Sequence, residues 1–191
     1  MCWAKHVTLE SRNGLSDNIV PFHKEPTPKD WIVLNVDGVV SRTSRRAIAR
    51  GVVRDSTSNW VMGYNQFLGN CSIFDVELWG ILDGLKLIQR RGHNNVIIHS
   101  DSLEVVKVIH ENVSKSSTSA LIRRIHWILS QESQWILRYI PREDNKCADY
   151  LSKLAFEREN DLRLFESPPD DVLDFFKSDK ERTISPLEYF L

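Results

Sequence analysis

The spacing of hydrophobic residues changes in a fixed order along this chain, and that order constrains the fold more than any other feature. Three short apolar runs come first, at residues 31–37, 47–54 and 60–67. The turn-forming residues 55–59 separate the second run from the third. Short apolar runs bounded by turn residues are typical of buried strands, so this part of the chain predicts three strands in an antiparallel meander.

Residues 72–91 change to a helical spacing, in which apolar side chains recur every three or four positions and Gly92 supplies a stop. A strand-like run at 96–101 and a helix-like segment at 102–111 follow directly. Two strands of one sheet that are joined through a helix run parallel to each other. The sheet is therefore predicted to be mixed, with parallel strands added to the meander.

The remaining pattern completes one α/β domain. A helix is predicted at 120–131, a last strand at 135–140 and a last helix from Asn145. We therefore expect a five-stranded mixed sheet flanked by helices over residues 31–156. Residues 1–30 end in three prolines and show no sustained period, which predicts an irregular or flexible lead-in.

The charge is unevenly distributed over the chain. In total, 25 Lys and Arg stand against 26 Asp and Glu, which excludes a protein that coats nucleic acid by bulk charge alone. Residues 31–156, however, contain 16 basic and 12 acidic side chains, whereas residues 157–191 contain 5 basic and 10 acidic ones. The pattern indicates a basic domain followed by an acidic tail, in which residues 172–176 are a short helix candidate.

Cysteine and histidine positions argue against a disulfide framework or a zinc site. The 3 cysteines and 6 histidines are scattered, without the short spacings of zinc ligands. No apolar run approaches the roughly 18 residues of a membrane span. The first ten residues also lack the charged-then-apolar pattern of a signal peptide. We expect a soluble, intracellular protein without a membrane partner.

Four carboxylates occupy positions where an ordinary surface charge is unexpected. Asp37 and Asp101 each end an apolar strand, so they meet if those two strands are neighbours. Glu77 lies among apolar residues near the start of the long helix, and Asp149 lies one turn inside the last helix. Helix capping by Asp101 and ordinary polar helix faces for Glu77 and Asp149 are the alternative explanations.

Carboxylates that converge in one cleft repel each other unless a cation neutralises them. Hard oxygen ligands select Mg²⁺ or Mn²⁺. Two such ions about 4 Å apart activate a water and stabilise the leaving oxygen of a phosphodiester. The four carboxylates therefore favour metal-assisted phosphodiester hydrolysis.

Four segments resemble the motifs of the type 1 ribonuclease H family, and each contains one of these carboxylates. Their sequences are LNVDG at 34–38, VELWG at 76–80, HSDS at 99–102 and PREDNKCADYLSKLA at 141–155. They are most similar to the reverse-transcriptase-like form that plant genomes carry in non-LTR retroelements. Further matching phrases are GVVRD at 51–55, WVMG at 60–63 and LFESPP at 164–169.

The resemblance implies a fold, a site and a reaction. It implies a ribonuclease H-like fold and a site for two Mg²⁺ ions, with Mn²⁺ as a substitute and Asp37 between both ions. The implied ligands are Asp37, Glu77, Asp101 and Asp149. The implied reaction is endonucleolytic hydrolysis of the RNA strand of an RNA–DNA hybrid, at positions that carry 2′-hydroxyls. Asn145 is expected either to orient Asp149 or to act as a simple N-cap.

The chain departs from the family pattern in three places. Residues 136–149 contain no histidine, although many members have one before the fourth carboxylate. The loop at 41–50 is rich in arginine rather than glycine, and Asp149 follows Asp101 by only 48 positions, which leaves no room for an extra basic helix. We expect weak substrate binding as a consequence.

Basic side chains near the predicted site are the candidates for nucleic-acid contact, because clustered cations attract phosphate backbones. They are Arg42, Arg45, Arg46, Arg50, Arg142 and Lys146, with Asn145 added for its position. A hairpin that merely improves solubility is the alternative for the arginine-rich loop. The leading hypothesis is a metal-dependent ribonuclease that acts on RNA–DNA hybrids. The alternative is a catalytically inactive nucleic-acid-binding module derived from a retroelement.

Overall fold

The computed structural model describes residues 27–111, 119–151, 162–174 and 176. Within them, six strands form one sheet in the order β5-β4-β1-β2-β3-β6. The strands are β1 (Ile32–Val40), β2 (Arg46–Arg54), β3 (Trp60–Asn70), β4 (Asn95–Ser100), β5 (Gln134–Tyr139) and β6 (Arg163–Phe165). Strands β1, β2, β3 and β6 pair antiparallel, whereas β4 pairs parallel with both β1 and β5. The predicted mixed α/β sheet is confirmed.

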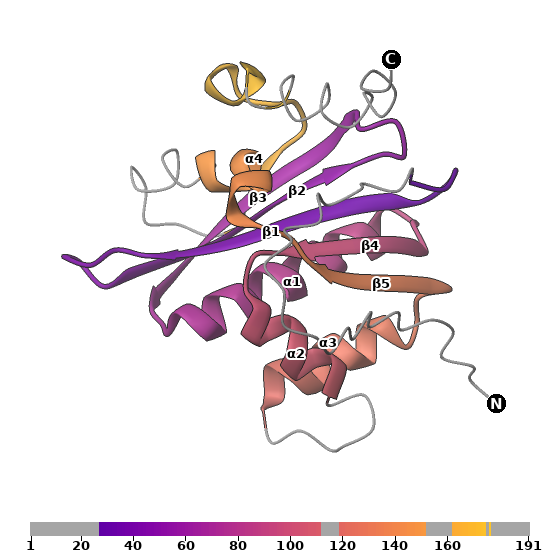
Figure 1. The fold of residues 1–191 in the computed structure, drawn as a ribbon. Coiled ribbons are helices and arrows are strands. Elements are labelled where there is room, and N and C mark those ends of the chain that lie inside the picture. Colours follow the sequence, from indigo (N-terminus) through magenta and orange to yellow (C-terminus); the bar gives the residue numbers. More distant parts are fainter. Residues whose placement is uncertain (1–26, 112–118, 152–161, 175, 177–191) are drawn as a thin grey trace, which may run out of the picture.

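The helices cover both faces of this sheet. They are α1 (Ile73–Arg90), α2 (Leu103–Glu111), α3 (Ala120–Leu129), the short 3-10 turn η1 (Arg142–Asp144) and α4 (Lys146–Tyr150), and residues 170–174, which overlap the predicted helical segment of the tail, are also helical. Helices α1, α2 and α3 lie on one face, and α4 lies on the other (Figure 1). The main hydrophobic core fills the space between the sheet and the first three helices. Residues 152–155 of the predicted last helix are outside the described residues.

Local signals explain where α1 begins and ends. The Ser72 hydroxyl accepts a hydrogen bond from the backbone N–H of Asp75, which satisfies one of the free donors at the helix start. Gly92 has a φ of +77°, in the left-handed region that glycine adopts without strain. These two residues fix the limits of α1 and therefore the position of Glu77 near its first turn.

Two glycines let α1 pack closely on the sheet. The fully buried Tyr64 passes between Gly51 on β2 and Gly84 on α1, and its hydroxyl donates to the carbonyl of Gly80. A Cβ added at Gly51 would lie 2.4 Å from the Tyr64 hydroxyl, and one at Gly84 would lie 2.6 Å from it. Only glycine fits at these positions, so α1 is held at a fixed distance from β1 and β2.

The sheet extends beyond the predicted domain limit at residue 156, and it has six strands where five were predicted. Strand β6 pairs with the outer edge of β3, and the Trp60 side chain donates to the carbonyl of Phe165 at 3.2 Å. Phe165 and Val172 pack with Val52 and Leu151 in a second apolar cluster. A strand of three residues is too short to show a pattern, which explains why the sequence did not reveal it.

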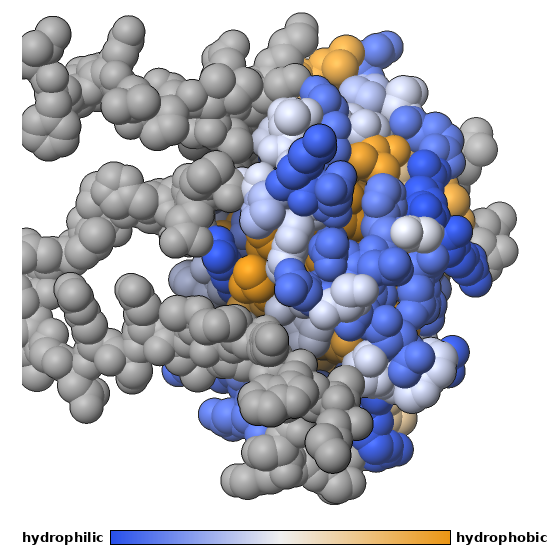
Figure 2. Space-filling model, turned by 90° about the vertical axis from the view of Figure 1, so that its right-hand side faces the viewer, coloured by the Kyte–Doolittle hydropathy of each residue, from blue (hydrophilic) through white to orange (hydrophobic). Residues whose placement is uncertain are grey.

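Figure 2 shows a mainly hydrophilic surface where the described residues are in view. Hydrophilic side chains predominate there, and hydrophobic ones are confined to separate areas. Among the residues that the structure describes, no helix is both long and apolar enough to cross a membrane.

Candidate active site

The first two predicted carboxylates meet where the pairing of β1 with β4 stops. The last pair of the parallel ladder is Val36 with Ser100, so Asp37 and Asp101 are the next residues on the two strands. Side chains at the carboxyl ends of neighbouring parallel strands emerge at the same edge of the sheet. The strand adjacency on which the sequence-based expectation depended is present.

Helix α1 brings the third carboxylate to the same edge. Glu77 is 5% exposed, and its Oε1 accepts a hydrogen bond from the backbone N–H of Gly38 at 3.0 Å. A Cβ at Gly38 would lie 2.7 Å from a Val76 methyl group and 3.2 Å from the backbone nitrogen of Glu77. The absence of a side chain at Gly38 therefore allows the first turn of α1 to approach β1.

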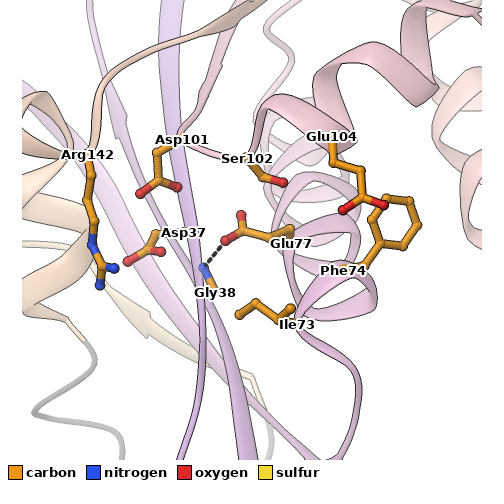
Figure 3. A pocket seen from close by; sticks show the side chains of 9 residues that line it. All are labelled: Asp37, Gly38, Ile73, Phe74, Glu77, Asp101, Ser102, Glu104 and Arg142. Carbon is orange, nitrogen blue, oxygen red and sulfur yellow. Dashed lines mark hydrogen bonds between the residues drawn. The ribbon is translucent and has the colours of Figure 1, made fainter.

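The three carboxylates form a candidate cation site. One oxygen from each of Asp37, Glu77 and Asp101 lies within 4.8 Å of the other two. Figure 3 shows the three side chains pointing toward one another. The second oxygen of Glu77 is buried and has no hydrogen-bond partner among the described residues. A buried acceptor without a donor is costly unless a cation neutralises it, so this oxygen set fits a hard divalent ion.

The cluster raises the pKa values of its members. Burial raises the pKa of Glu77 to about 8, and the negative charges of Asp37 and Asp101 add to this effect. Burial and then the charge of Asp37 raise the pKa of Asp101 to about 6. Burial also raises the pKa of Asp37, although Arg50 opposes the shift. A bound divalent ion would reverse this repulsion and displace the proton from Glu77.

These carboxylates line an open cleft of about 280 Å³, which we call the carboxylate cleft (Figure 3). Its other walls are formed by Gly38, Ile73, Phe74, Ser102, Glu104 and Arg142. A water molecule takes about 30 Å³ of liquid volume, so the cleft accommodates an ion with several waters and a phosphate group. Arg142 provides a cation at the rim, where its side chain is 73% exposed.

The fourth predicted carboxylate lies in a different arrangement. Asp149 accepts a hydrogen bond from Nη2 of Arg50 at 2.8 Å. The same guanidinium donates from Nε to Oδ2 of Asp37 at 2.9 Å and from Nη2 to that same oxygen. Arg50 therefore bridges Asp37 and Asp149, and we call these three residues the Arg50 cluster. Arg142 approaches the same oxygen of Asp149 at 3.5 Å.

Arg50 was predicted to contact nucleic acid, and the structure places it elsewhere. Its side chain is fully buried between the sheet and α4. In the antiparallel ladder, Arg50 stands directly opposite Asp37, so the two side chains share one face of the sheet. Counting back from the turn at 41–45 would have revealed this cross-strand pair, but composition alone suggested an exposed basic loop.

Asn145 is also buried, at 2% exposure, and its side chain makes no capping hydrogen bond. Asn145 therefore occupies the N-cap position of α4, while its side chain bonds to β1 rather than capping the helix. Its Nδ2 donates to the carbonyl of Val36 at 2.7 Å, and its Oδ1 accepts from Asn35 at 3.4 Å. Because these bonds fasten the start of α4 to β1, Asn145 sets the position of Asp149 relative to Asp37.

The other predicted basic residues divide by exposure. Arg42 and Arg45 are exposed at the tip of the hairpin between β1 and β2. Arg142 and Lys146 are exposed beside α4. Arg46 is partly buried, with its guanidinium 5.0 Å from the centre of the Phe67 ring. Four cations therefore remain available to a phosphate backbone.

The family model described as reverse transcriptase-like matches residues 35–155 of this chain. A protein of Arabidopsis thaliana, provisionally assigned as a ribonuclease H protein, is 31% identical over 152 residues. That match covers 78% of this chain and 24% of the relative. The chain thus spans about a quarter of the length of the curated relative.

Solved structures show the same fold at low sequence identity. Ribonuclease H1 of the archaeon Halobacterium salinarum has a TM-score of 0.60 at 17% identity and covers 67% of this chain and 99% of its own. The N-terminal ribonuclease H domain of a Mycobacterium tuberculosis protein has a TM-score of 0.60 at 22% identity. This match covers 66% of the present chain and 94% of the solved one. LC11 ribonuclease H1, solved in complex with an RNA/DNA hybrid, has a TM-score of 0.55 at 22% identity. This match covers 63% of the present chain and 92% of the solved one.

Proposed function

Because this chain belongs to the reverse transcriptase-like family of ribonuclease H proteins, we propose that it hydrolyses the RNA strand of RNA–DNA hybrids with a divalent metal ion. The observation that carries the proposal is the convergence of Asp37, Glu77 and Asp101 at the end of two parallel strands. The cleft beside them has the space and the open side that a nucleic-acid backbone requires.

The three carboxylates have the chemistry of an Mg²⁺ site, and Mn²⁺ prefers the same ligands. A bound ion lowers the pKa of a coordinated water and neutralises charge on a phosphate. Asp37, Glu77 and Asp101 would hold the ion, and Glu77, whose raised pKa favours the protonated form in the ion-free protein, would ionise when the ion binds. Gly38 fixes the orientation of Glu77 through its N–H group.

Exposed cations on either side of the cleft are proposed to hold the substrate. Arg142 lies on the cleft wall and Lys146 follows it at the start of α4, while Arg42 and Arg45 extend from the hairpin. Such contacts to phosphate position a duplex without reading its sequence. Selection of RNA over DNA then requires contacts to 2′-hydroxyls in the minor groove of the hybrid.

Cleavage of an end-labelled RNA–DNA hybrid in Mg²⁺ or Mn²⁺ tests this proposal. The wild-type protein is expected to cut the RNA strand and to leave a DNA duplex intact. Asp101→Asn removes the charge of one proposed metal ligand, at a residue that is partly exposed. We expect the cleavage rate to fall by about 100-fold or more. The matched control is Asp144→Asn, which removes the same charge from an exposed position on η1. Equal, absent cleavage by wild type and Asp101→Asn would contradict the enzymatic proposal.

One observation favours the alternative of a catalytically inactive binding module. Arg50 engages two of the four family carboxylates, Asp37 and Asp149. A module of this kind would bind a hybrid with strong salt dependence and release it uncut. Hybrid binding measured by fluorescence anisotropy, together with the cleavage assay, separates the two functions.

A further inference from the structure

Arg50 is a permanently charged side chain in a fully buried position. Its relative exposure is 0%, and arginine does not lose its proton at any physiological pH. A buried cation is retained only where anions compensate it, and here the anions are Asp37 and Asp149. The guanidinium is thus the compensating charge for two of the four carboxylates that the family resemblance assigns to metal ions.

The hydrogen bonds show which oxygens Arg50 uses. Two of its nitrogens donate to Oδ2 of Asp37, and Nη2 also donates to Oδ1 of Asp149 at 2.8 Å. Oδ1 of Asp37 takes part in none of these bonds. A metal ion that bridged the two oxygens facing Arg50 would lie about 2.1 Å from each, in the space that the guanidinium fills. That position therefore does not fit a second divalent ion.

Charge balance leads to the same result. The four carboxylates that the resemblance assigns to metal, apart from the exposed Glu104 at the cleft wall, are balanced by one divalent ion, Arg50 and Arg142, which is 3.5 Å from Asp149. Two divalent ions together with both arginines would leave an excess of positive charge in a partly buried space. Repulsion between like charges at this range is strong because little water separates them.

We infer that Arg50 replaces one of two metal ions, so that this chain binds a single divalent ion at Asp37, Glu77 and Asp101. The inference rests on the proposed metal site and defines its stoichiometry. Arg50 acts through Asp37 and Asp149 and is a positioning residue. It holds Oδ2 of Asp37 on the side of α4 and leaves the other oxygen for the carboxylate cleft.

Titration of the full chain with Mn²⁺, followed by the electron paramagnetic resonance signal of free Mn²⁺, tests the stoichiometry. We expect one ion for wild type and for Arg50→Lys, which keeps the charge, and two ions for Arg50→Ala. Arg46→Ala removes the same charge from the same strand, away from Asp149, and is expected to leave one ion bound. Two ions in the wild type, or one ion at unchanged affinity in a folded Arg50→Ala variant, would overturn the inference.

A second variant keeps the inference testable if Arg50→Ala does not fold. Asp149→Asn alters a side chain that is 49% exposed, and circular dichroism verifies its fold. Because Asp149 is paired with Arg50 and is no ligand of the single ion, its replacement should change Mn²⁺ affinity by about twofold at most. A loss of about tenfold or more would overturn the inference. Absence of cleavage with one bound ion would instead count against the proposed function alone.

Discussion

The carboxylate cleft and the Arg50 cluster share Asp37 but neutralise their charges differently. In the Arg50 cluster a buried guanidinium compensates Asp37 and Asp149 within the protein. In the carboxylate cleft, burial and mutual repulsion raise the pKa values of Glu77 and Asp101, and Glu77 has an oxygen without a partner. One side of Asp37 is thus charge-compensated within the protein, whereas the other side has the arrangement of a candidate cation site.

The largest expected effect is the pH dependence of stability in the metal-free protein. Folding raises the pKa of Glu77 from the ordinary value of 4.5 to about 8. The folded form therefore binds more protons than the unfolded form between these values, and stability is lost as pH rises from about 4.5 to 8. The contribution of Glu77 is up to about 5 kcal/mol, measured by urea unfolding in the presence of a chelator.

Glu77→Gln sharpens this prediction because glutamine keeps the shape of the side chain and cannot ionise. We expect the variant to lose most of the pH dependence and to be more stable than wild type at pH 8 without metal. Saturating Mg²⁺ should stabilise wild type at pH 8 and leave Glu77→Gln nearly unaffected. A wild-type stability that does not fall between pH 5 and pH 8 would contradict the description of the carboxylate cleft.

The next effect concerns the approach of α1 to β1. In Gly38→Ala, the added methyl group would meet the buried Val76 side chain at 2.7 Å and must displace the first turn of α1. We expect a loss of about 1–3 kcal/mol in the free energy of unfolding and weaker Mn²⁺ binding, since Glu77 moves with that turn. Gly69→Ala is a control for a glycine with open space around it, where only backbone strain is introduced. Unchanged metal affinity in Gly38→Ala would contradict this account of how Glu77 is positioned.

The smallest effect is expected at the exposed cations. Replacing Arg42 and Arg45 together with Ala should weaken hybrid binding by about tenfold and lower the salt slope by about 2, because each removes one phosphate contact. Replacing Arg123 and Arg124 together with Ala, both exposed on α3, removes the same two charges away from the hairpin. If both changes weaken binding equally, the hairpin has no specific part in holding the substrate.

The carboxylate cleft could be predicted from the sequence because the spacing of apolar residues within each strand and helix shows where its carboxylates lie. The strand-like runs before Asp37 and Asp101 and the helical period around Glu77 predicted the elements. The meeting of Asp37 with Asp101 was expected only if their strands were neighbours, and β1 and β4 do pair. The short strand β6 escaped because three residues show no period. The strands and the helix that carry Asp37, Asp101 and Glu77 could thus be predicted without knowing how their side chains pack.

The Arg50 cluster was missed because it depends on strand register and burial, which the arginine-rich composition of the loop does not show. A run of arginines in a loop predicts exposure, and Arg42 and Arg45 are indeed exposed. Arg50 is buried because the ladder places it opposite Asp37 and because Asn145 fastens α4 above it. Because of its register in the hairpin, Arg50 is an internal counter-ion and not the phosphate contact that the sequence predicted.

The measurement that tests the central claim most directly is a crystal structure of the full chain grown with Mn²⁺, with anomalous scattering used to locate the metal. We predict one peak, among the carboxylate oxygens of Asp37, Glu77 and Asp101, with Arg50 still between Asp37 and Asp149. The absence of a peak among those three carboxylates, or a peak between Asp37 and Asp149 with Arg50 displaced, would contradict the account.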